Sequence, residues 1–269
     1  MTTQPPLPFA AAGISAIVPV YNEAPGVRAT LTHLSTILGS LPWPYEIIVI
    51  DDGSTDASAN AIAAVADPAI RVIRHATNQG YGASLTAGLH AAHFPSLVIT
   101  DADGTYPLAT IPLLLAGLDQ HVMAVGARVG TNVHIPIMRR PIKWALRRLA
   151  EGITGQSIPD LNSGLRAMRK EAILPIEPLL PQRFSWTSTI TIALLLQKQP
   201  VQFLPIAYYR RQGTSKIHPF WDTVRALQCI WRATGVLAMP DVSPHPAPRL
   251  TAMQKIAGWF VRILHTSQW

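Results

Sequence analysis

Short apolar runs alternate with segments of helical length along the first 130 residues. The runs are rich in β-branched residues and predict buried strands at residues 14–20, 46–50, 70–73, 97–100 and 122–125. Helices are expected between them, at residues 26–38, 57–66, 83–92 and 108–118. Because strands separated by helices form right-handed βαβ units, the pattern predicts an α/β fold with a mainly parallel sheet flanked by helices.

The second half of the chain carries amphipathic segments. A helix is expected at residues 139–153, with Arg140, Lys143 and Arg147 on one face and an apolar stripe on another, made of Ile142, Leu146, Leu149 and Ile153. An apolar helix at 186–196 and a strand at 201–207 follow. The expected organisation is a tail at 1–13, one α/β domain at 14–218, an amphipathic helix at 219–239, a proline-rich linker at 240–249 and a second amphipathic helix at 250–269.

Composition adds a basic and apolar bias. The 269 residues carry a net charge of +7, yet only 14% of them are charged and the mean hydropathy is +0.21. We therefore expect some apolar surface to be exposed, and phosphate-bearing ligands or an anionic membrane surface as partners. Neither a signal peptide nor a transmembrane span is predicted. The single cysteine, Cys229, excludes an intramolecular disulfide framework and a cysteine-rich zinc site.

Two aspartates directly follow the strand expected at 97–100. In the segment Asp101-Ala102-Asp103 the two carboxylates are one residue apart, and Gly104 and Pro107 favour a turn after them. Both carboxylates can reach one hard divalent cation, and Mg²⁺ or Mn²⁺ held in this way bridges the phosphates of a nucleotide. Acidic residues also end strands at ordinary surfaces, so this pattern alone leaves both interpretations open.

Two other predicted strands end in the same way. Asp51 ends the second strand, and Glu23 follows the first. The residues after Asp51 are explained by turn and helix-capping chemistry, which suits Gly53, Ser54, Thr55 and Asp56. That chemistry leaves Asp51 itself unexplained. Ligands of parallel sheets bind beyond the carboxyl ends of the strands, so three strands that end in acids favour one shared site.

Other motifs are weaker. Gly80-Tyr81-Gly82 opens a predicted helix, but the third glycine of a dinucleotide-binding fingerprint would fall at Leu85. The chain has no Walker A lysine motif, and its nine histidines are scattered. An oxidoreductase is therefore disfavoured, and no nucleic-acid partner is expected.

Together these segments resemble the GT-A glycosyltransferases of family 2. The resemblance rests on residues 18–23, 48–56, 78–83 and 101–103, which read Val-Pro-Val-Tyr-Asn-Glu, Ile-Val-Ile-Asp-Asp-Gly-Ser-Thr-Asp, Asn-Gln-Gly-Tyr-Gly-Ala and Asp-Ala-Asp. Residues 160–166 and 211–216 are similar to the branch of dolichyl-phosphate mannose synthases and other polyprenyl-phosphate glycosyltransferases. The resemblance spans residues 14–218 and implies a GT-A, Rossmann-like sheet. No Gln-x-x-Arg-Trp motif is present, which argues against a processive synthase.

The resemblance also implies residue roles. The nucleotide-binding residues would be Pro19, Tyr21, Glu23, Asp51, Asp52, Asp101 and Ala102. Asp101 and Asp103 would hold Mg²⁺ or Mn²⁺. The catalytic residues would be Asp103, Arg128, Arg140 and Asp160, and the acceptor phosphate would meet Ser163, Arg211 and Lys216. Thr105 stands where the mannose synthases often carry a glutamine as a further metal ligand.

The expected function is an inverting, metal-dependent transfer of one sugar from a GDP- or UDP-sugar to a polyprenyl phosphate. A lipid phosphate is already an anion and needs no general base, and the segment around Trp186 offers no obvious one. Two alternatives stay open: a family 2 transferase with a soluble or glycan hydroxyl acceptor, and a non-catalytic nucleotide-binding scaffold. The expected location is the cytoplasmic side of a membrane, with peripheral attachment through the C-terminal amphipathic helices. A membrane-protein partner or a homo-oligomer is left open.

Overall fold

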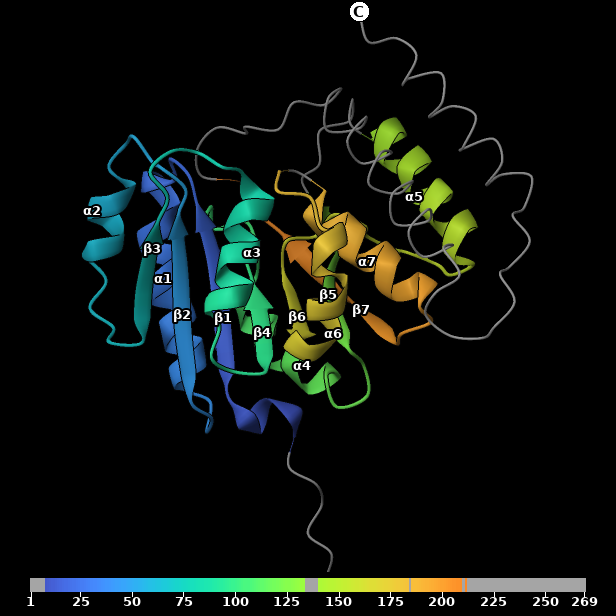
Figure 1. The fold of residues 1–269 in the computed structure, drawn as a ribbon, viewed down its shortest axis with the longest axis horizontal. Helices are drawn as coiled ribbons and strands as arrows, with labels where there is room; N and C mark the ends of the chain where they lie inside the picture. Colours follow the sequence, from blue (N-terminus) through green and yellow to red (C-terminus); the bar gives the residue numbers. More distant parts are fainter. Residues whose placement is uncertain (1–7, 134–139, 184, 210, 212–269) are drawn as a thin grey trace, which may run out of the picture.

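The structure is a computed structural model that describes residues 8–133, 140–183, 185–209 and 211. Its centre is a seven-stranded sheet in the order β3-β2-β1-β4-β6-β5-β7 (Figure 1). The strands are β1 (Ile14–Val20), β2 (Tyr45–Asp51), β3 (Ile70–Arg74), β4 (Ser96–Ile99), β5 (Met123–Val133), β6 (Arg166–Arg169) and β7 (Val201–Tyr208). Only β6 runs antiparallel to its neighbours. The predicted α/β class with a mainly parallel sheet is confirmed.

Helices cover both faces of the sheet. One face is covered by α1 (Ala24–Gly39), the 3₁₀ helix η2 (Leu108–Thr110) and α4 (Ile111–Gly117). The other face is covered by α3 (Tyr81–Ala91), α6 (Lys170–Ile173), the 3₁₀ helix η4 (Leu174–Leu179) and α7 (Trp186–Leu196). At the periphery, α2 (Ser58–Ala63) packs on α1, and α5 (Arg140–Thr154) packs on α7 (Figure 1).

The alternation of side chains along the central strands explains these two layers. In β1, Ile14, Ala16 and Val18 pack in the core beneath α1, while Ile17 packs in the core beneath α3. All four side chains are at most 1% exposed. Full burial of one such aliphatic side chain stabilises the fold by about 1.5–3 kcal/mol. Burial on both faces is why these strands read as unbroken apolar runs in the sequence.

Strand β6 was not predicted, and β5 extends beyond the predicted residues 122–125. Strand β6 has arginines at both ends, so it lacks the apolar run that the other strands show. It lies between β4 and β5, where Arg166 pairs with Ile99 and with Val125. The β5 extension contains glycines and an arginine, and pairing with β7 along most of its length holds it extended.

The amphipathic helix expected at residues 139–153 is present as α5. The described part of its apolar stripe packs against the rest of the domain. Ala150 and Ile153 are buried, and together with the partly buried Leu149 they form a small core with Ile192 and Leu195 of α7. This stripe is therefore used for packing within the domain. The basic side of the helix keeps Arg147 and Arg148 partly exposed, both close to Glu151.

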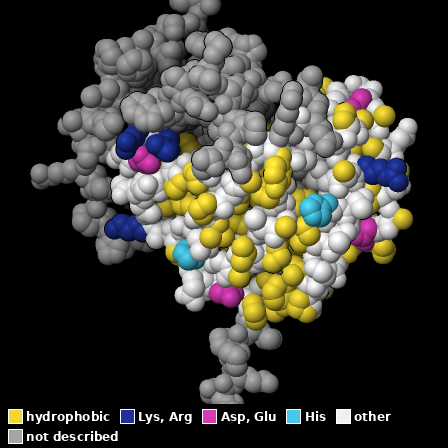
Figure 2. Space-filling view, turned by 180° about the vertical axis from the view of Figure 1, so that it is seen from behind, with side chains coloured by type: hydrophobic (Ala, Val, Ile, Leu, Met, Phe, Trp, Pro, Cys, Tyr) yellow, Lys and Arg dark blue, Asp and Glu magenta, His cyan; other side chains and the backbone are white. Residues whose placement is uncertain are grey.

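The opposite face of the molecule shows hydrophobic side chains gathered at the surface with few charged ones among them (Figure 2). Among the described residues, Leu113 of α4 is a large hydrophobic side chain that is 65% exposed. This fits the low content of charged residues. None of the helices in the described ranges combines the length and the apolar character that crossing a bilayer requires.

The first described residues pack against the α/β domain. Within the tail predicted at 1–13, the 3₁₀ helix η1 (Phe9–Ala12) packs on α4, and the Phe9 amide donates to Asp119 Oδ1 over 2.8 Å. The segments predicted at 219–239, 240–249 and 250–269 lie outside the described residues.

Candidate active site

The acidic residues singled out in the sequence gather at one edge of the sheet. Strands β2, β1 and β4 are neighbours, and all three run parallel. Asp51 ends β2, Glu23 follows β1, and Asp101 lies two residues after the end of β4. The prediction that three adjacent strands end in acids at a shared edge is confirmed.

The loop after β4 fixes the second aspartate firmly. Asp103 is 3% exposed, and its Oδ1 accepts hydrogen bonds from the Thr105 amide at 3.1 Å and from Thr105 Oγ1 at 2.7 Å. Thr105 is itself fully buried. The threonine at this position therefore orients the Asp103 carboxylate and leaves Oδ2 to face the site.

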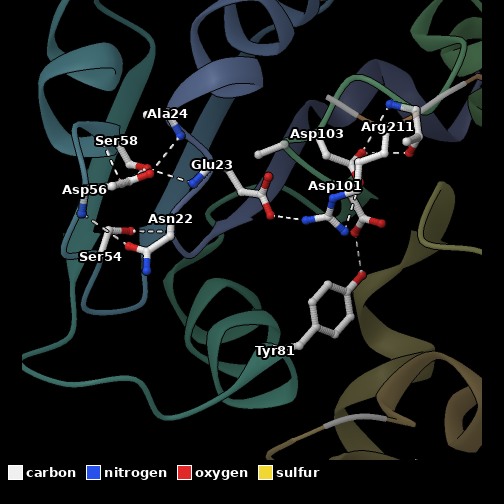
Figure 3. A network of polar contacts seen from close by, with 12 residues as sticks. Asn22, Glu23, Ala24, Ser54, Asp56, Ser58, Tyr81, Asp101, Asp103 and Arg211 are labelled. Carbon is white, nitrogen blue, oxygen red and sulfur yellow. Dashed lines mark hydrogen bonds and ion pairs between the residues drawn. The ribbon is translucent and has the colours of Figure 1, made fainter. Parts of the chain in front are cut away.

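Asp101 is held by a different part of the chain. Tyr81, the first residue of α3, donates its hydroxyl to Asp101 Oδ1 over 3.0 Å (Figure 3). Burial raises the pKa of Asp101 to about 7, and the neighbouring Asp103 carboxylate adds to the rise. Two carboxylates so close together repel each other, and a bound cation would relieve that repulsion.

An arginine from the far side of the sheet reaches this pair. Arg211, just beyond β7, donates to the Glu23 carboxylate, and its Nη1 lies 3.4 Å from Asp103 Oδ2 (Figure 3). Arg211 was expected to meet an acceptor phosphate. In this structure its positive charge instead bridges two carboxylates that come from different strands.

These residues fit a divalent cation that is shared with a substrate. Among the described residues no cluster of three or more His, Cys, Asp or Glu side chains could hold a metal without help. Asp101 and Asp103 supply two hard oxygen ligands, which suits Mg²⁺ or Mn²⁺ when water and substrate phosphates complete the coordination. The Arg211 guanidinium beside Asp103 shows that this position attracts a positive charge.

Two of the predicted catalytic residues form a buried ion pair. Arg128 donates from Nε to Asp160 Oδ2 over 2.6 Å and from Nη2 to Asp160 Oδ1 over 2.9 Å. Burial opposes ionisation of Asp160, but Arg128 more than offsets it, so the pKa of Asp160 lies below its usual value. The Arg128 guanidinium also lies 5.0 Å from the centre of the Tyr208 ring. Asp160 thereby positions Arg128.

The predicted nucleotide-binding residues lie along the same edge, with different degrees of access. Asp51 is 4% exposed, and its Oδ1 accepts from the Ser54 amide over 3.0 Å. Pro19 and Tyr21 are partly exposed on the loop side of β1. Ala102 is buried, and its carbonyl accepts from Thr30 Oγ1 of α1 over 3.1 Å. Ala102 therefore anchors the loop against α1.

The residues after Asp51 that were expected to cap a helix instead bind neighbouring loops to each other, and the N-cap of α2 is Ala57, which makes no side-chain capping hydrogen bond. Asn22 lies in the left-handed backbone region at φ +51°, and its Oδ1 accepts from the Thr55 amide over 2.7 Å. Asp56 accepts from the Ser58 amide at the start of α2 and from the Ala24 amide at the start of α1. This network ties together the loops that follow β1 and β2 (Figure 3).

Asp52 and Ser163 are turned inward. Both oxygens of the Asp52 carboxylate are engaged, because Oδ1 contacts His75 Nδ1 and the Gln79 amide while Oδ2 accepts from the Gly80 amide. Ser163 is fully buried. In this structure neither side chain offers an exposed surface to a nucleotide or an acceptor phosphate. Arg140 begins α5, but its side chain lies outside the described part of the chain, as does the whole of Lys216.

Arg166 helps to build the site, although the sequence analysis gave it no role. Arg166 is fully buried, and it donates to the carbonyls of Leu161 and Ser163 and, over 2.6 Å, to Thr191 Oγ1. It thereby holds the loop that carries Asp160. Arg166 is the last residue of the motif at 160–166, so the sequence did single out this position. Its burial was not expected, because most arginines in folded proteins are exposed.

Comparisons with known proteins agree with this geometry. Residues 15–174 match the family described as Glycosyl transferase family 2. The chain is 32% identical over 163 residues to an undecaprenyl-phosphate 4-deoxy-4-formamido-L-arabinose transferase of Serratia proteamaculans, covering 60% of this chain and 50% of the relative. A Klebsiella pneumoniae protein of the same description is 31% identical over 176 residues, covering 64% and 52%. The chain thus spans about half the length of these curated relatives.

Solved structures show the same fold. Glucosyl-3-phosphoglycerate synthase from Mycobacterium tuberculosis, in complex with Mn²⁺, UDP and phosphoglyceric acid, superposes with a TM-score of 0.67 at 18% identity. The match covers 89% of this chain and 86% of the other. The predicted GT-A architecture is confirmed, and because the family match covers more than half of the sequence, the chain belongs to glycosyl transferase family 2.

Proposed function

We propose that this chain transfers one sugar from a GDP- or UDP-sugar to a polyprenyl phosphate, with inversion at the anomeric carbon and with the help of Mg²⁺ or Mn²⁺. The observation that carries the proposal is the meeting of Asp101, Asp103 and Arg211 at the carboxyl edge of the sheet. In the proposed reaction Asp101 and Asp103 would hold a nucleotide-bound cation, and Arg211 beside them would attract a second phosphate. The similarity to undecaprenyl-phosphate 4-deoxy-4-formamido-L-arabinose transferases supports the same chemistry.

The donor side is formed by the loops after β1, β2 and β4. Asp51 and Glu23 are carboxylates that can accept hydrogen bonds from a base or a ribose. Asp101 and Asp103 would hold the divalent cation, which when bound neutralises the diphosphate of the leaving nucleotide. Thr105 keeps Asp103 oriented for this task through two hydrogen bonds to Oδ1.

The carboxylates favour a phosphate as the attacking group. Each of those placed at this edge among the described residues already has a partner: Arg211 beside Glu23 and Asp103, Arg128 on Asp160, Tyr81 on Asp101, and the loop amides on Asp51 and Asp52. With Asp101 and Asp103 assigned to the cation, the remaining carboxylates are each held by one of these partners, and we assign none of them to take a proton from a hydroxyl. A phosphate oxygen attacks the anomeric carbon as an anion, and the bonding electrons of the broken bond leave with the nucleoside diphosphate, so no general base is needed.

The acceptor side needs positive charge. Arg211 lies just beyond β7 and Arg128 lies within β5, on the side of the sheet away from Asp51. Bringing a lipid phosphate next to an anionic donor is unfavourable unless such cations offset the repulsion. We also assign Lys216 and Arg140 to this acceptor region. In addition, we propose that the chain attaches peripherally to the cytoplasmic side of a membrane through residues 219–239 and 250–269. A membrane-protein partner or a second copy of the chain would be compatible with this arrangement.

The experiment has two steps. Thermal-shift measurements with Mn²⁺ and a series of UDP- and GDP-sugars identify the donor, because a bound ligand raises the melting temperature by mass action. The labelled donor is then incubated with a polyprenyl phosphate. Label in an organic-extractable, mild-acid-labile lipid supports the proposal. Label found only in water-soluble products assigns the chain to a soluble acceptor, and nucleotide binding without any transfer identifies a scaffold.

A further inference from the structure

We infer that Tyr81 is a positioning residue for the metal site, and that its hydroxyl fixes the Asp101 carboxylate in the orientation that a divalent cation needs. The inference rests on the proposed metal dependence and deepens it. Tyr81 belongs to a different motif from Asp101, at residues 78–83, and the sequence assigned it no role of its own. The structure brings the two motifs together.

The Asp101 carboxylate lies between two features that restrict it. On one side, Tyr81 donates to Oδ1 over 3.0 Å (Figure 3). On another side lies the Cα of Gly164, where an added Cβ would come within 2.8 Å of Oδ1 and 2.9 Å of Oδ2. The hydroxyl and the bare glycine backbone together hold the carboxylate in place. With Oδ1 engaged by Tyr81, Oδ2 is left for a cation shared with Asp103.

Tyr81 is itself held in place from both sides of its loop. Before it, the amides of Gln79 and Gly80 donate to the Asp52 carboxylate over 2.9 and 2.8 Å. After it, the Gly82 amide donates to the Arg183 carbonyl over 3.0 Å. A side chain at Gly82 would collide with the Pro181 carbonyl, since its Cβ would lie 1.9 Å away. These contacts hold the loop backbone on both sides of the tyrosine, and so fix the position from which its side chain extends toward Asp101.

This arrangement also gives Asp52 a role. Its carboxylate is 3% exposed and fully engaged with the loop, so it acts on the site through Tyr81. The result is a chain of contacts from Asp52 through the loop and Tyr81 to Asp101. A metal ligand that is already oriented loses less conformational freedom when the cation binds.

The test compares two tyrosines that make the same contact in different places. Tyr81→Phe removes the hydroxyl at the site. Tyr45→Phe removes a hydroxyl that donates to Asp67 Oδ2 over 3.2 Å at the start of β2, at the opposite edge of the sheet. Binding of Mn²⁺ to the full chain is measured by electron paramagnetic resonance of the free ion, with Asp103→Asn as the variant that defines loss of the site. Melting temperatures are recorded for all variants.

We expect Tyr81→Phe to weaken Mn²⁺ binding about tenfold, since a hydrogen bond to a charged group is lost, and Tyr45→Phe to leave it within about twofold. The apparent KM for Mn²⁺ should rise in Tyr81→Phe, while kcat at saturating Mn²⁺ stays near that of the unaltered chain. Equal Mn²⁺ affinity of Tyr81→Phe and the unaltered chain would overturn the inference, as would equal losses in the two tyrosine variants.

Failure of the inference about Tyr81 can be told apart from failure of the proposed function. If Mn²⁺ binds and Tyr81→Phe weakens it, the inference stands even when no lipid product forms, and only the proposed acceptor is wrong. If the unaltered chain binds no Mn²⁺, the proposed metal dependence and the role of Tyr81 both fail.

Discussion

Arg128 and Asp160 form a bidentate ion pair in which two guanidinium nitrogens donate to two different carboxylate oxygens, at 2.6 and 2.9 Å. The Arg128 amide also donates to Asp160 Oδ2 over 3.0 Å. The side chains are 8% and 9% exposed. The pair therefore joins β5 to the loop before β6 and presents Arg128 in one orientation.

Removing one charge of this pair should be costly. We predict that Asp160→Asn lowers the free energy of unfolding by about 3 kcal/mol, because it leaves a buried guanidinium without its counter-charge. The matched control is Glu171→Gln, which breaks an exposed contact with Arg169 and should change stability by less than about 0.5 kcal/mol. Chemical denaturation measures both, and losses of similar size in the two variants would contradict the account.

The same pair predicts a pH dependence of stability. The pKa of Asp160 in the folded protein lies below its ordinary value of 3.8, because Arg128 outweighs the effect of burial. The stabilisation is therefore complete above pH 3.8 and is lost as the pH falls through the lower folded pKa. The stability difference between the unaltered chain and Asp160→Asn should shrink between about pH 4 and pH 2. A difference that is constant over this range would show that Asp160 contributes no ionised carboxylate.

Arg211 should compete with the metal ion in the absence of nucleotide. Its guanidinium lies beside Asp103, so removing that charge should make the site more attractive to a cation. We predict that Arg211→Ala binds Mn²⁺ about fivefold more tightly, roughly 1 kcal/mol, while its kcat/KM for the acceptor falls about 100-fold. Arg74→Ala is the control, because Arg74 is exposed and lies 3.8 Å from Asp51. Weaker Mn²⁺ binding in Arg211→Ala would count against a competing role.

Gly164 should be sensitive to any side chain. In Gly164→Ala the Cβ would press on both Asp101 oxygens, so Mn²⁺ affinity should fall at least about tenfold. Gly155→Ala provides the comparison: its Cβ meets nothing within 4 Å, but its φ of +69° should cost about 1 kcal/mol of stability. Mn²⁺ titration and thermal unfolding of both variants separate the local effect from a general one. Unchanged Mn²⁺ affinity in Gly164→Ala would show that Asp101 is less confined than the structure indicates.

The sequence predicts the parallel part of this fold well, because strands such as β1 are buried on both faces and their apolar runs are unbroken. It also predicts which strands end in acids. Strand β6 escapes prediction because its pairing depends on neighbours distant in the sequence, and because Arg166 is buried only through its contacts with the carbonyls and Thr191 around it. The sequence does not predict the positioning roles of Tyr81 and Asp52 for the same reason, since loops that are far apart in the sequence meet only in the folded chain.

The most direct test of the proposed function compares two acceptors that differ only in the phosphate. Polyprenyl phosphate and the corresponding polyprenol, of equal chain length and in the same detergent, are each incubated with the labelled donor and Mn²⁺, and the initial rate of label transfer to lipid is measured. Asp103→Asn serves as the inactive control. We predict transfer to the phosphate alone and none by Asp103→Asn. Transfer to the polyprenol at a comparable rate, or undiminished transfer by Asp103→Asn, would contradict the account.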